Sequence, residues 1–303
     1  MQLGGYWLPF VALGCGILLA ATITYLVLPV SLNDPDMTEN TNKESVVDLL
    51  NVPSICVAVL SLFVASTSIG FLFSSLEPHM RQFDISPLMM GKQKSEWGKI
   101  EGTNQVYIFH IVIAGAMFAV LGGTYALTGF IFGSICDRFL SSPMPINFLG
   151  ISFITLAFFF LGPAPFLGLP TLMPVCVAAL ILHGCGLGAV FVSSFCISHT
   201  EAIASGFSNN INTYGLVSGL WTSTFALGAF VGPSAAGILL EHFGFPWATM
   251  FISCFGLFLL VAGSSTLCYK YKASLCTGDQ HGFLPNGERS FLLAHFMKNL
   301  SDK

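Results

Sequence analysis

The sharpest candidate for chemistry in the sequence is Glu77. It directly follows an apolar run from Val52 to Leu76, and Pro78 comes next. Proline lacks the N–H of a helical hydrogen bond, so Pro78 loosens the helix around the carboxyl group. An apolar surrounding favours the neutral form of a carboxyl group, which makes proton uptake and release near neutral pH feasible. We therefore predict that Glu77 binds and releases a proton; the alternative is an interfacial residue without such a role.

Asp137 and Arg138 form a second charged site, at the end of the apolar run from Val106 to Cys136. Gly133, one helical turn before Asp137, permits tight packing against a neighbouring helix. Charged side chains at a helix end can latch one side of a helical bundle through charge contacts. A gating role for this pair is what the family resemblance described below implies, and the alternative is loop charge that only orients the chain in a membrane.

Three aromatic side chains, Tyr125, Tyr214 and Trp221, could offer their faces to an organic cation. Aromatic residues at helical spacing usually serve packing, so packing is the alternative for all three. His110 and His183 stand within apolar runs as well. A lone histidine in such a run is usually a neutral, hydrogen-bonded side chain, and we expect this role rather than proton transport.

The remaining residues contain no pattern of a catalytic or metal site. Nine cysteines lie mostly within apolar runs, without a CxxC motif or the Cys/His spacing of a metal site, and we interpret them as core filler. No Ser/His/Asp or phosphate-binding constellation appears either. We therefore expect a protein that is not an enzyme, has no cofactor and no metal, and has no nucleic-acid partner.

Long apolar runs must position these residues. Of the 303 residues, 54% are hydrophobic and only 9% are charged, far less charge than a soluble domain carries. Most runs have about 20 to 25 residues, the length of a helix across a bilayer core of about 30 Å, and backbone groups in hydrocarbon need the internal hydrogen bonds of a helix. The sequence thus predicts an all-α polytopic membrane protein with about seven transmembrane helices. The uncharged runs are Tyr6–Pro29, Val52–Leu76, Val106–Cys136, Ile146–Leu167, Leu172–Ile197, Leu216–Leu240 and Trp247–Tyr269.

Lys and Arg residues between the runs indicate the orientation of the chain. The side that holds the C-terminus collects more of them and is therefore predicted to be cytosolic by the positive-inside rule. The stretch after Glu77 then lies on the opposite side. The first set is Lys43, Arg138, Lys270, Lys272, Arg289, Lys298 and Lys303, and the second is Arg81, Lys92, Lys94 and Lys99.

A glycine-rich pattern stands in the sixth run. Gly228, Gly232 and Pro233 form a GxxxGP sequence, and Gly237 follows it. Glycines four residues apart permit close contact between helices, and proline permits a bend. We interpret these four residues as structural, serving helix packing and bending.

Several stretches of the chain resemble a known family. YGLVSGLW at 214–221, GAFVGPSAAG at 228–237 and FGFPW at 243–247 resemble the eleventh and twelfth helices of the vesicular amine transporters, solute carrier family 18 of the major facilitator superfamily. LEP at 76–78 is similar to the seventh helix of that family, and GSICDR at 133–138 to the cytosolic turn after the eighth helix of major facilitator proteins. The matches come in the family's order over about 270 residues.

The resemblance implies a partial major facilitator fold, the C-terminal six-helix half with one preceding helix, and helices one to five are expected to be absent. Residues 92–104 (KQKSEWGKIEGTN) match nothing in the family, which predicts an insertion between about 91 and 117. Four segments follow from the resemblance: helix six at 1–30, an acidic cytosolic linker at 31–51, the six-helix half at 52–270 and a cytosolic tail at 271–303.

By resemblance, the function is proton-coupled antiport of a small organic cation across the lipid bilayer of a vesicle. Glu77 would couple the proton, Asp137 and Arg138 would form the gate, and the GxxxGP pattern is similar to the family's antiporter motif.

The substrate branch follows from two departures. Monoamine and acetylcholine members carry acidic residues in helices ten and eleven, whereas the matching positions here are Val192 and Thr222. Since neither side chain can pair with a cation, the chain resembles the polyamine branch more than the monoamine branch. Thr222 joins the three aromatic residues named above as a candidate substrate contact.

The tail contains a candidate sorting signal. Glu288, Leu292 and Leu293 fit the acidic dileucine pattern that endosomal sorting adaptors read, and polyamine-type relatives have a similar one. The pattern predicts sorting adaptors as partners and a vesicular or endolysosomal membrane as the location.

Two other functions stay open. Asp137-Arg138-Phe139 after the third run mimics a seven-helix receptor, although the last run has no Asn-Pro-x-x-Tyr. Alternatively, the chain is a truncated product that does not transport. A major facilitator pore lies between two halves, so we expect no transport by this chain alone. Its predicted polar lining, with Ser61 and Ser68 on one helix face, would meet lipid or another chain.

Overall fold

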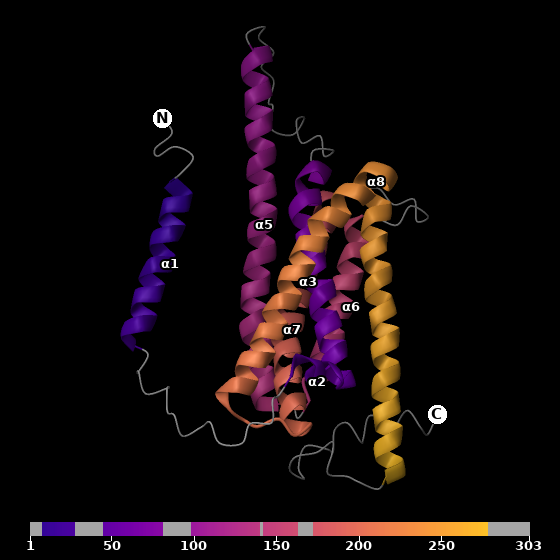
Figure 1. The fold of residues 1–303 in the computed structure, drawn as a ribbon. Coiled ribbons are helices and arrows are strands. Elements are labelled where there is room, and N and C mark those ends of the chain that lie inside the picture. The colour runs from indigo at the N-terminus through magenta and orange to yellow at the C-terminus, as the bar shows by residue number, and fades with distance from the viewer. Residues whose placement is uncertain (1–7, 28–44, 81–97, 140–141, 163–171, 278–303) are drawn as a thin grey trace. The chain divides into compact units, whose positions relative to one another are not determined.

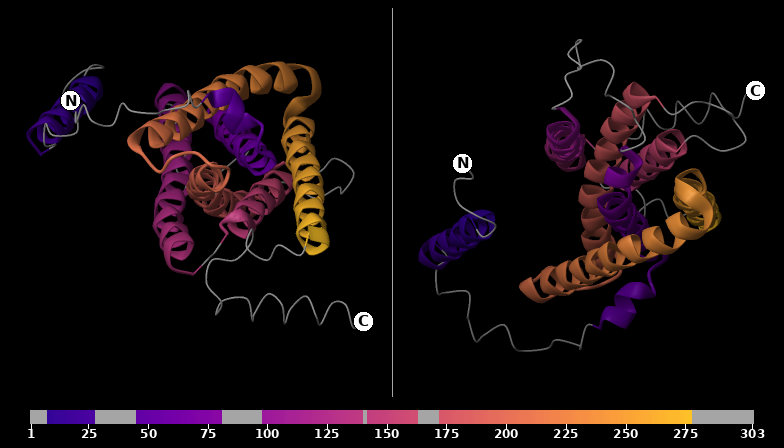
Figure 2. Two further views of the ribbon diagram at one scale, coloured as in Figure 1. Left: turned by 60° about the horizontal axis from the view of Figure 1, so that its bottom comes forward. Right: turned by 90° about the horizontal axis from the view of Figure 1, so that it is seen from above.

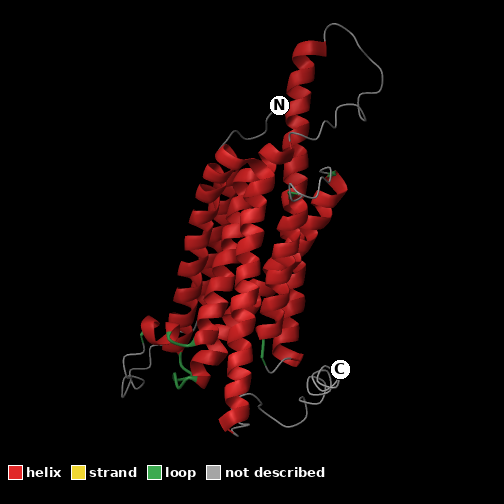
Figure 3. Ribbon diagram, turned by 90° about the vertical axis from the view of Figure 1, so that its right-hand side faces the viewer, coloured by secondary structure: helices red, strands yellow, loops and turns green. Residues whose placement is uncertain are grey.

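A computed structural model describes residues 8–27, 45–80, 98–139, 142–162 and 172–277 of the chain. Within these ranges every regular element is a helix and no strand occurs (Figure 3). The prediction of an all-α protein is therefore confirmed.

The described residues form seven helices, labelled as in Figure 1. Five of them, α3, α5, α6, α7 and α8, are long and apolar enough to cross a membrane. The helices are α1 Leu8–Val27, α2 Val46–Leu50, α3 Pro53–Met80, α5 Gly98–Phe139, α6 Met144–Leu161, α7 Met173–Ala204 and α8 Ile211–Thr277.

The chain divides into two units, 1–44 and 45–303. The first unit contains α1, in which the hydroxyl groups of Thr22 and Thr24 donate to backbone carbonyls one turn earlier at 2.8 and 2.9 Å. Such bonds satisfy the hydroxyl groups within the helix itself, as an apolar surrounding requires. The second unit contains α2 to α8 and every predicted site residue that the structure describes.

α8 is kinked. Gly244 has φ 75° and ψ 170°, which are not helical values, so it separates two arms of this helix. A positive φ favours glycine because glycine has no Cβ atom. The first arm takes up the predicted run Leu216–Leu240, and the second takes up Trp247–Tyr269. Apart from single residues at three helix ends, Val52, Gly162 and Leu172, the described part of each predicted run falls on a helix or on an arm of α8.

α5 begins earlier than predicted. The helix has 42 residues and starts at Gly98, whereas the apolar run was predicted to start at Val106. Residues 98–104 of the expected insertion therefore continue the helix, and 92–97 lie outside the described residues. At 1.5 Å per residue the helix is about 63 Å long, twice the thickness of a bilayer core. Within this helix, Val112–Asp137 has the length and composition of a membrane span.

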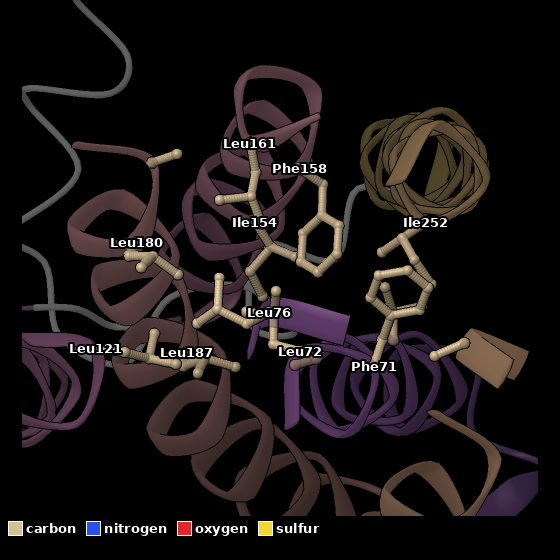
Figure 4. Close-up of a cluster of buried hydrophobic side chains, with 14 of the residues drawn as sticks. Phe71, Leu72, Leu76, Leu121, Ile154, Phe158, Leu161, Leu180, Leu187 and Ile252 are labelled. Atoms are coloured by element: carbon tan, nitrogen blue, oxygen red, sulfur yellow. The ribbon is translucent and has the colours of Figure 1, made fainter. Parts of the chain in front are cut away.

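Within the second unit, α7 lies among the other long helices (Figure 2). It packs extensively against α5 and α6, and also against α3, while α3 packs along α8. The main core lies between α3, α5, α6, α7 and the second arm of α8 (Figure 4). Phe71 of α3 meets Phe158 of α6 edge-on with ring centroids 5.8 Å apart, and Leu180 of α7 and Ile252 of α8 complete the cluster.

Candidate functional site

α5 approaches α7 closely at two glycines of α7. A Cβ atom at Gly184 would lie 2.8 Å from the carbonyl oxygen of Leu121, and one at Gly188 would lie as close to the backbone of α5. Larger residues at these positions would push the two helices apart. The close contact places Tyr125 of α5 next to Phe191 of α7, whose ring centroids are 5.6 Å apart.

Four aromatic side chains meet where α5, α7 and the first arm of α8 converge, and we call them the aromatic cluster: Tyr125, Phe191, Trp221 and Phe225. The ring of Phe191 is central and contacts the other three edge-on, with centroid distances of 5.6, 5.9 and 5.5 Å. Trp221 and Phe225, one helical turn apart, stack with centroids 5.8 Å apart and planes inclined by 1°. Both arrangements are favourable for aromatic rings.

Ser194 of α7 orients the indole ring of the cluster. The Nε1 atom of Trp221 donates to the Oγ atom of Ser194 at 3.1 Å. The hydroxyl group of Ser194 in turn donates to the carbonyl oxygen of Phe191 at 3.2 Å. Because Ser194 is buried and bonded on both sides, it fixes the indole relative to α7.

The aromatic cluster has a buried floor and a more open edge. Phe191 is 7% exposed, whereas Tyr125 is 37% exposed and Trp221 is half-buried. An ammonium group within about 6 Å of such a ring is attracted to its face, by about 0.5 to 2 kcal/mol depending on desolvation. The cluster can therefore attract an organic cation without an acidic side chain.

The structure brings two of the four predicted substrate contacts together. Tyr125 and Trp221 both belong to the aromatic cluster, where the ring of each meets that of Phe191. Thr222 is exposed and directly follows Trp221 on α8. Tyr214 lies two turns earlier, where its ring centroid is 3.9 Å from that of His199 with an interplanar angle of 32°.

Sequence reasoning missed three residues of this site, Phe191, Ser194 and Phe225. Phe225 stands one helical turn after Trp221, so helical spacing alone could have added it to the prediction. Phe191 and Ser194 lie on a different helix, and nothing in the sequence pairs that helix with the first arm of α8.

Glu77 lies in the last turn of α3, where it is half-buried, and Pro78 follows within the helix. The next residue, His79, is buried, and its ring stacks on that of Phe245 with centroids 3.5 Å apart and an angle of 14°. Phe245 directly follows the kink residue Gly244. The carboxyl group therefore stands at the end of the bundle where α8 turns back on itself.

Glu77 is far from the aromatic cluster. α3 and the first arm of α8 run in the same direction, because Gly228 lies against Phe63 and Gly232 lies against Gly70. In this register Trp221 is level with the first turns of α3, and Glu77 is level with the last turn of the first arm. At 1.5 Å per residue the two sites are roughly 25 Å apart along the bundle. A cation in the cluster could not touch Glu77.

Asp137 stands at the end of the bundle opposite to Glu77. α5 and α7 run in the same direction, and the end of α7, at Ala202, packs with Ile55 near the start of α3. Asp137 is exposed on α5, and the side chain of Arg138 lies outside the described residues. A Cβ atom at Gly133 would meet no described atom within 4 Å.

Of the four residues of the GxxxGP pattern and its following glycine, Gly228, Gly232 and Pro233 pack against α3, whereas Gly237 does not. A Cβ atom at Gly228 would lie 2.9 Å from the carbonyl oxygen of Phe63, and one at Gly232 would lie 2.7 Å from the backbone nitrogen of Phe71. Pro233 packs against Gly70 of α3: a Cβ atom added to Gly70 would lie 3.0 Å from the Cδ atom of Pro233. A Cβ atom added to Gly237 would have no described atom within 4 Å.

The predicted polar lining is wrong for two serines. Ser61 is 1% exposed and donates to the carbonyl oxygen of Val57 at 2.8 Å. Ser68 is fully buried, and its Oγ atom lies 2.8 Å from the Nε2 atom of His183 on α7. Both hydroxyl groups are satisfied inside the bundle, so they neither line a cavity face nor meet lipid. His183 is buried and hydrogen-bonded, as expected from its place in an apolar run.

Other predicted features lie outside the described residues. They are the sorting residues Glu288, Leu292 and Leu293, the linker from 31 to 44, and the tail from 278 onward. The side chain of His110 is likewise not described.

Comparisons with known proteins give one consistent result. MFS-type transporter SLC18B1 of Mus musculus is 28% identical over 272 residues, which are 89% of this chain and 52% of that protein. The Rattus norvegicus protein of the same name is 28% identical over 86% of this chain, and the Homo sapiens protein is 26% identical over 86%. The chain spans about half the length of these relatives. No family model matches it.

The helices and the relatives together support a multi-pass integral membrane protein that is similar to transporters. The relatives confirm the predicted resemblance: the chain is similar to proteins named MFS-type transporter SLC18B1. They also confirm that the chain is not an enzyme, and they speak against a seven-helix receptor. Within the described helices, no three His, Cys, Asp or Glu side chains gather in a way that could hold a metal ion.

Proposed function

We propose that the chain forms the cation-binding half of a proton-coupled antiporter for small organic cations of the polyamine or monoamine type. The observation that carries the proposal is the aromatic cluster, held by Ser194 at the contact of α5, α7 and α8. The relatives support the transport class. Because a major facilitator pore lies between two halves, the proposed pore needs a second half beside this one.

Cation binding in this proposal relies on aromatic faces. Val192 and Thr222, which match acidic positions of monoamine members, are uncharged, so the described residues offer no carboxylate at the aromatic cluster. Ring faces attract any accessible ammonium group and do not require an aromatic substrate. The aromatic cluster therefore suits polyamines as well as monoamines, and the polyamine branch is favoured only by resemblance, through Val192 and Thr222.

Proton coupling in this proposal acts at a distance from the bound cation. Glu77 is half-buried beside the stacked pair His79–Phe245 and the kink at Gly244. Protonation removes the charge of Glu77 and so favours burial of that end of the bundle, whereas ionisation favours hydration. The proton would thus set whether this end is closed or open, instead of competing with the cation for one site.

The opposite end is the proposed cytosolic gate, with Asp137 and Arg138 at the end of α5. The positive-inside rule places this end and the tail in the cytosol. Glu288, Leu292 and Leu293 of the tail are proposed to bind sorting adaptors, which would direct the protein to vesicular or endolysosomal membranes.

The first test measures binding. The purified chain in lipid nanodiscs is titrated with spermidine, with dopamine and with NaCl of equal ionic strength, and tryptophan fluorescence is recorded. We expect a saturable change with the organic cations that is lost in Trp221→Phe. A response to NaCl of the same size, or an unchanged response in Trp221→Phe, would contradict cation binding at the cluster.

The second test measures transport in proteoliposomes with an imposed pH gradient. The chain alone is compared with the chain joined to the other half of the mouse relative. We expect gradient-dependent uptake by the joined protein only. Saturable uptake by the chain alone would mean that two copies form a pore, and no uptake by either would support a product that does not transport.

A further inference from the structure

α5 and α7 keep one register along their contact. Thr124 lies against Gly184, and Thr128 lies against Gly188, so each step of four residues on α5 matches a step of four on α7. The hydroxyl group of Thr128 also donates to the carbonyl oxygen of Gly184 at 3.4 Å. Helices that run in the same direction with glycines at the contact stay close over several turns.

Two further turns along this register lead to a pair of cysteines. Eight residues after Thr128 stands Cys136, and eight residues after Gly188 stands Cys196. The two thiol groups face each other closely enough to interact across the two helices. Both are free thiols and both are half-buried. Helix register and side-chain contact therefore agree on the same pair.

Other described cysteines have different surroundings. The thiol of Cys56 donates to the carbonyl oxygen of Leu50 at 2.8 Å, and that of Cys176 lies 4.0 Å from the carbonyl oxygen of Leu161. Cys15 and Cys254 are exposed. They therefore serve as internal references for reactivity within the same chain.

We propose that Cys136 and Cys196 are a redox-sensitive pair that forms a reversible disulfide bond between α5 and α7. Two neighbouring thiols on adjacent helices can reach the S–S bond length of about 2.05 Å when their Cα atoms lie about 4.4 to 6.8 Å apart. The close approach at Gly184 and Gly188 holds the two helices together two turns before the cysteine pair.

The oxidant in the proposed reaction is a hydroperoxide. One cysteine sulfur attacks a peroxide oxygen, the O–O bond breaks, and the products are a sulfenic acid and an alcohol or water. The second sulfur then attacks the sulfenic sulfur, the S–O bond breaks, and water leaves as the S–S bond forms. In total two thiols lose two electrons and two protons, and the peroxide takes up both. A dithiol reductant reverses the bond by exchange.

The disulfide would fix the ends of α5 and α7 next to Asp137 and Arg138. It would do so whether or not the chain transports a solute, so this inference stands apart from the proposed function. The pair lies at the end of the bundle opposite to Glu77, so oxidation there would leave the proposed proton site untouched.

The test uses the complete chain, purified reduced and kept dilute in detergent. It is treated with hydrogen peroxide, and its remaining thiols are alkylated and identified by mass spectrometry. We expect loss of two of the nine alkylatable thiols, a cross-linked peptide that joins Cys136 to Cys196, monomer migration on a non-reducing gel, and full reversal by dithiothreitol. Cys136→Ser and Cys196→Ser should each abolish the cross-linked peptide, whereas Cys254→Ser should retain it.

The measurement on the unaltered chain decides the outcome, so a variant that fails to fold does not weaken the test. The proposal is overturned if both thiols remain alkylatable under conditions that oxidise Cys254, or if they are recovered only as separate oxidised acids. It is also overturned if the cross-link joins either cysteine to another chain.

Discussion

The aromatic cluster and the end of α3 around Glu77 differ in what holds them. The cluster depends on three helices: Phe191 comes from α7, Trp221 from α8 and Tyr125 from α5. Glu77 depends on its own helix end and on the neighbouring stack of His79 and Phe245. The first site can attract a cation without charge, and the second can carry a proton.

In the proposed function, cation binding and proton coupling therefore take place at different levels of the bundle. About 25 Å of helix separates the sites, so one substitution should affect binding or coupling but not both. A transporter that exchanged proton and cation on one carboxylate would show both losses at once. The predictions below test this difference, beginning with the largest effect.

The largest effect is expected from Glu77→Gln. In the protein joined to its second half, this change should abolish uptake driven by a pH gradient, because an amide cannot carry the proton. Spermidine binding by the fluorescence assay should stay within twofold of the unaltered protein. The matched control is Glu241→Gln, an exposed residue of α8 at the same end of the bundle, which should leave uptake unchanged. Loss of spermidine binding in Glu77→Gln would mean that the cation and the proton share one site, and would contradict the separation proposed here.

A second prediction concerns the close contact between α3 and the first arm of α8, which lies between the levels of the two sites. Gly232→Leu should destabilise the protein by at least about 1 to 3 kcal/mol, because its side chain would collide with the backbone of α3 at Gly70 and Phe71. Thermal unfolding in detergent measures this change. Gly237→Leu provides the control, since a Cβ atom there meets no described atom within 4 Å. Equal melting temperatures for the two variants would disprove the packing role of Gly232.

Removal of the indole should have a smaller effect, confined to binding. Trp221→Ala should weaken spermidine binding about tenfold, since one desolvated cation–π contact contributes on the order of 1.4 kcal/mol. Isothermal titration calorimetry in nanodiscs measures the spermidine affinity and does not depend on tryptophan fluorescence. Trp247→Ala removes an exposed tryptophan from the second arm of α8 and should leave affinity unchanged. A similar loss in both variants would place the cation elsewhere.

The helices could be predicted from the sequence, because the backbone groups of an uncharged run of span length need the internal hydrogen bonds of a helix in hydrocarbon. It did not predict the start of α5, since Gly98 and its neighbours are polar and carry no apolar signal. Ser61 and Ser68 share one helix face, but that face points into the bundle and not toward a pore.

The site itself was half predictable. Tyr125 and Trp221 stand out by residue type within apolar runs, and Glu77 by its charge. Phe191, by contrast, is one of 29 phenylalanines, and only the packing of α7 between α5 and α8 distinguishes it from the others. Contacts between helices distant in sequence need the folded chain, because periodicity describes one helix at a time.

The smallest expected effect tests how the aromatic cluster is held. Ser194→Ala removes the acceptor of the Trp221 Nε1 hydrogen bond, a bond with a net value of about 0.5 to 1.5 kcal/mol, so spermidine affinity should fall about threefold. Ser218→Ala is the control, because that exposed hydroxyl bonds only within α8, at 3.1 Å from the carbonyl oxygen of Gly215. If Ser194 acts by orienting the indole, then Ser194→Ala should have no further effect in a Trp221→Phe background, where the donor is gone. Additive losses in the double variant would instead mean that Ser194 contacts the cation directly, and the cluster would then be a mixed polar and aromatic site.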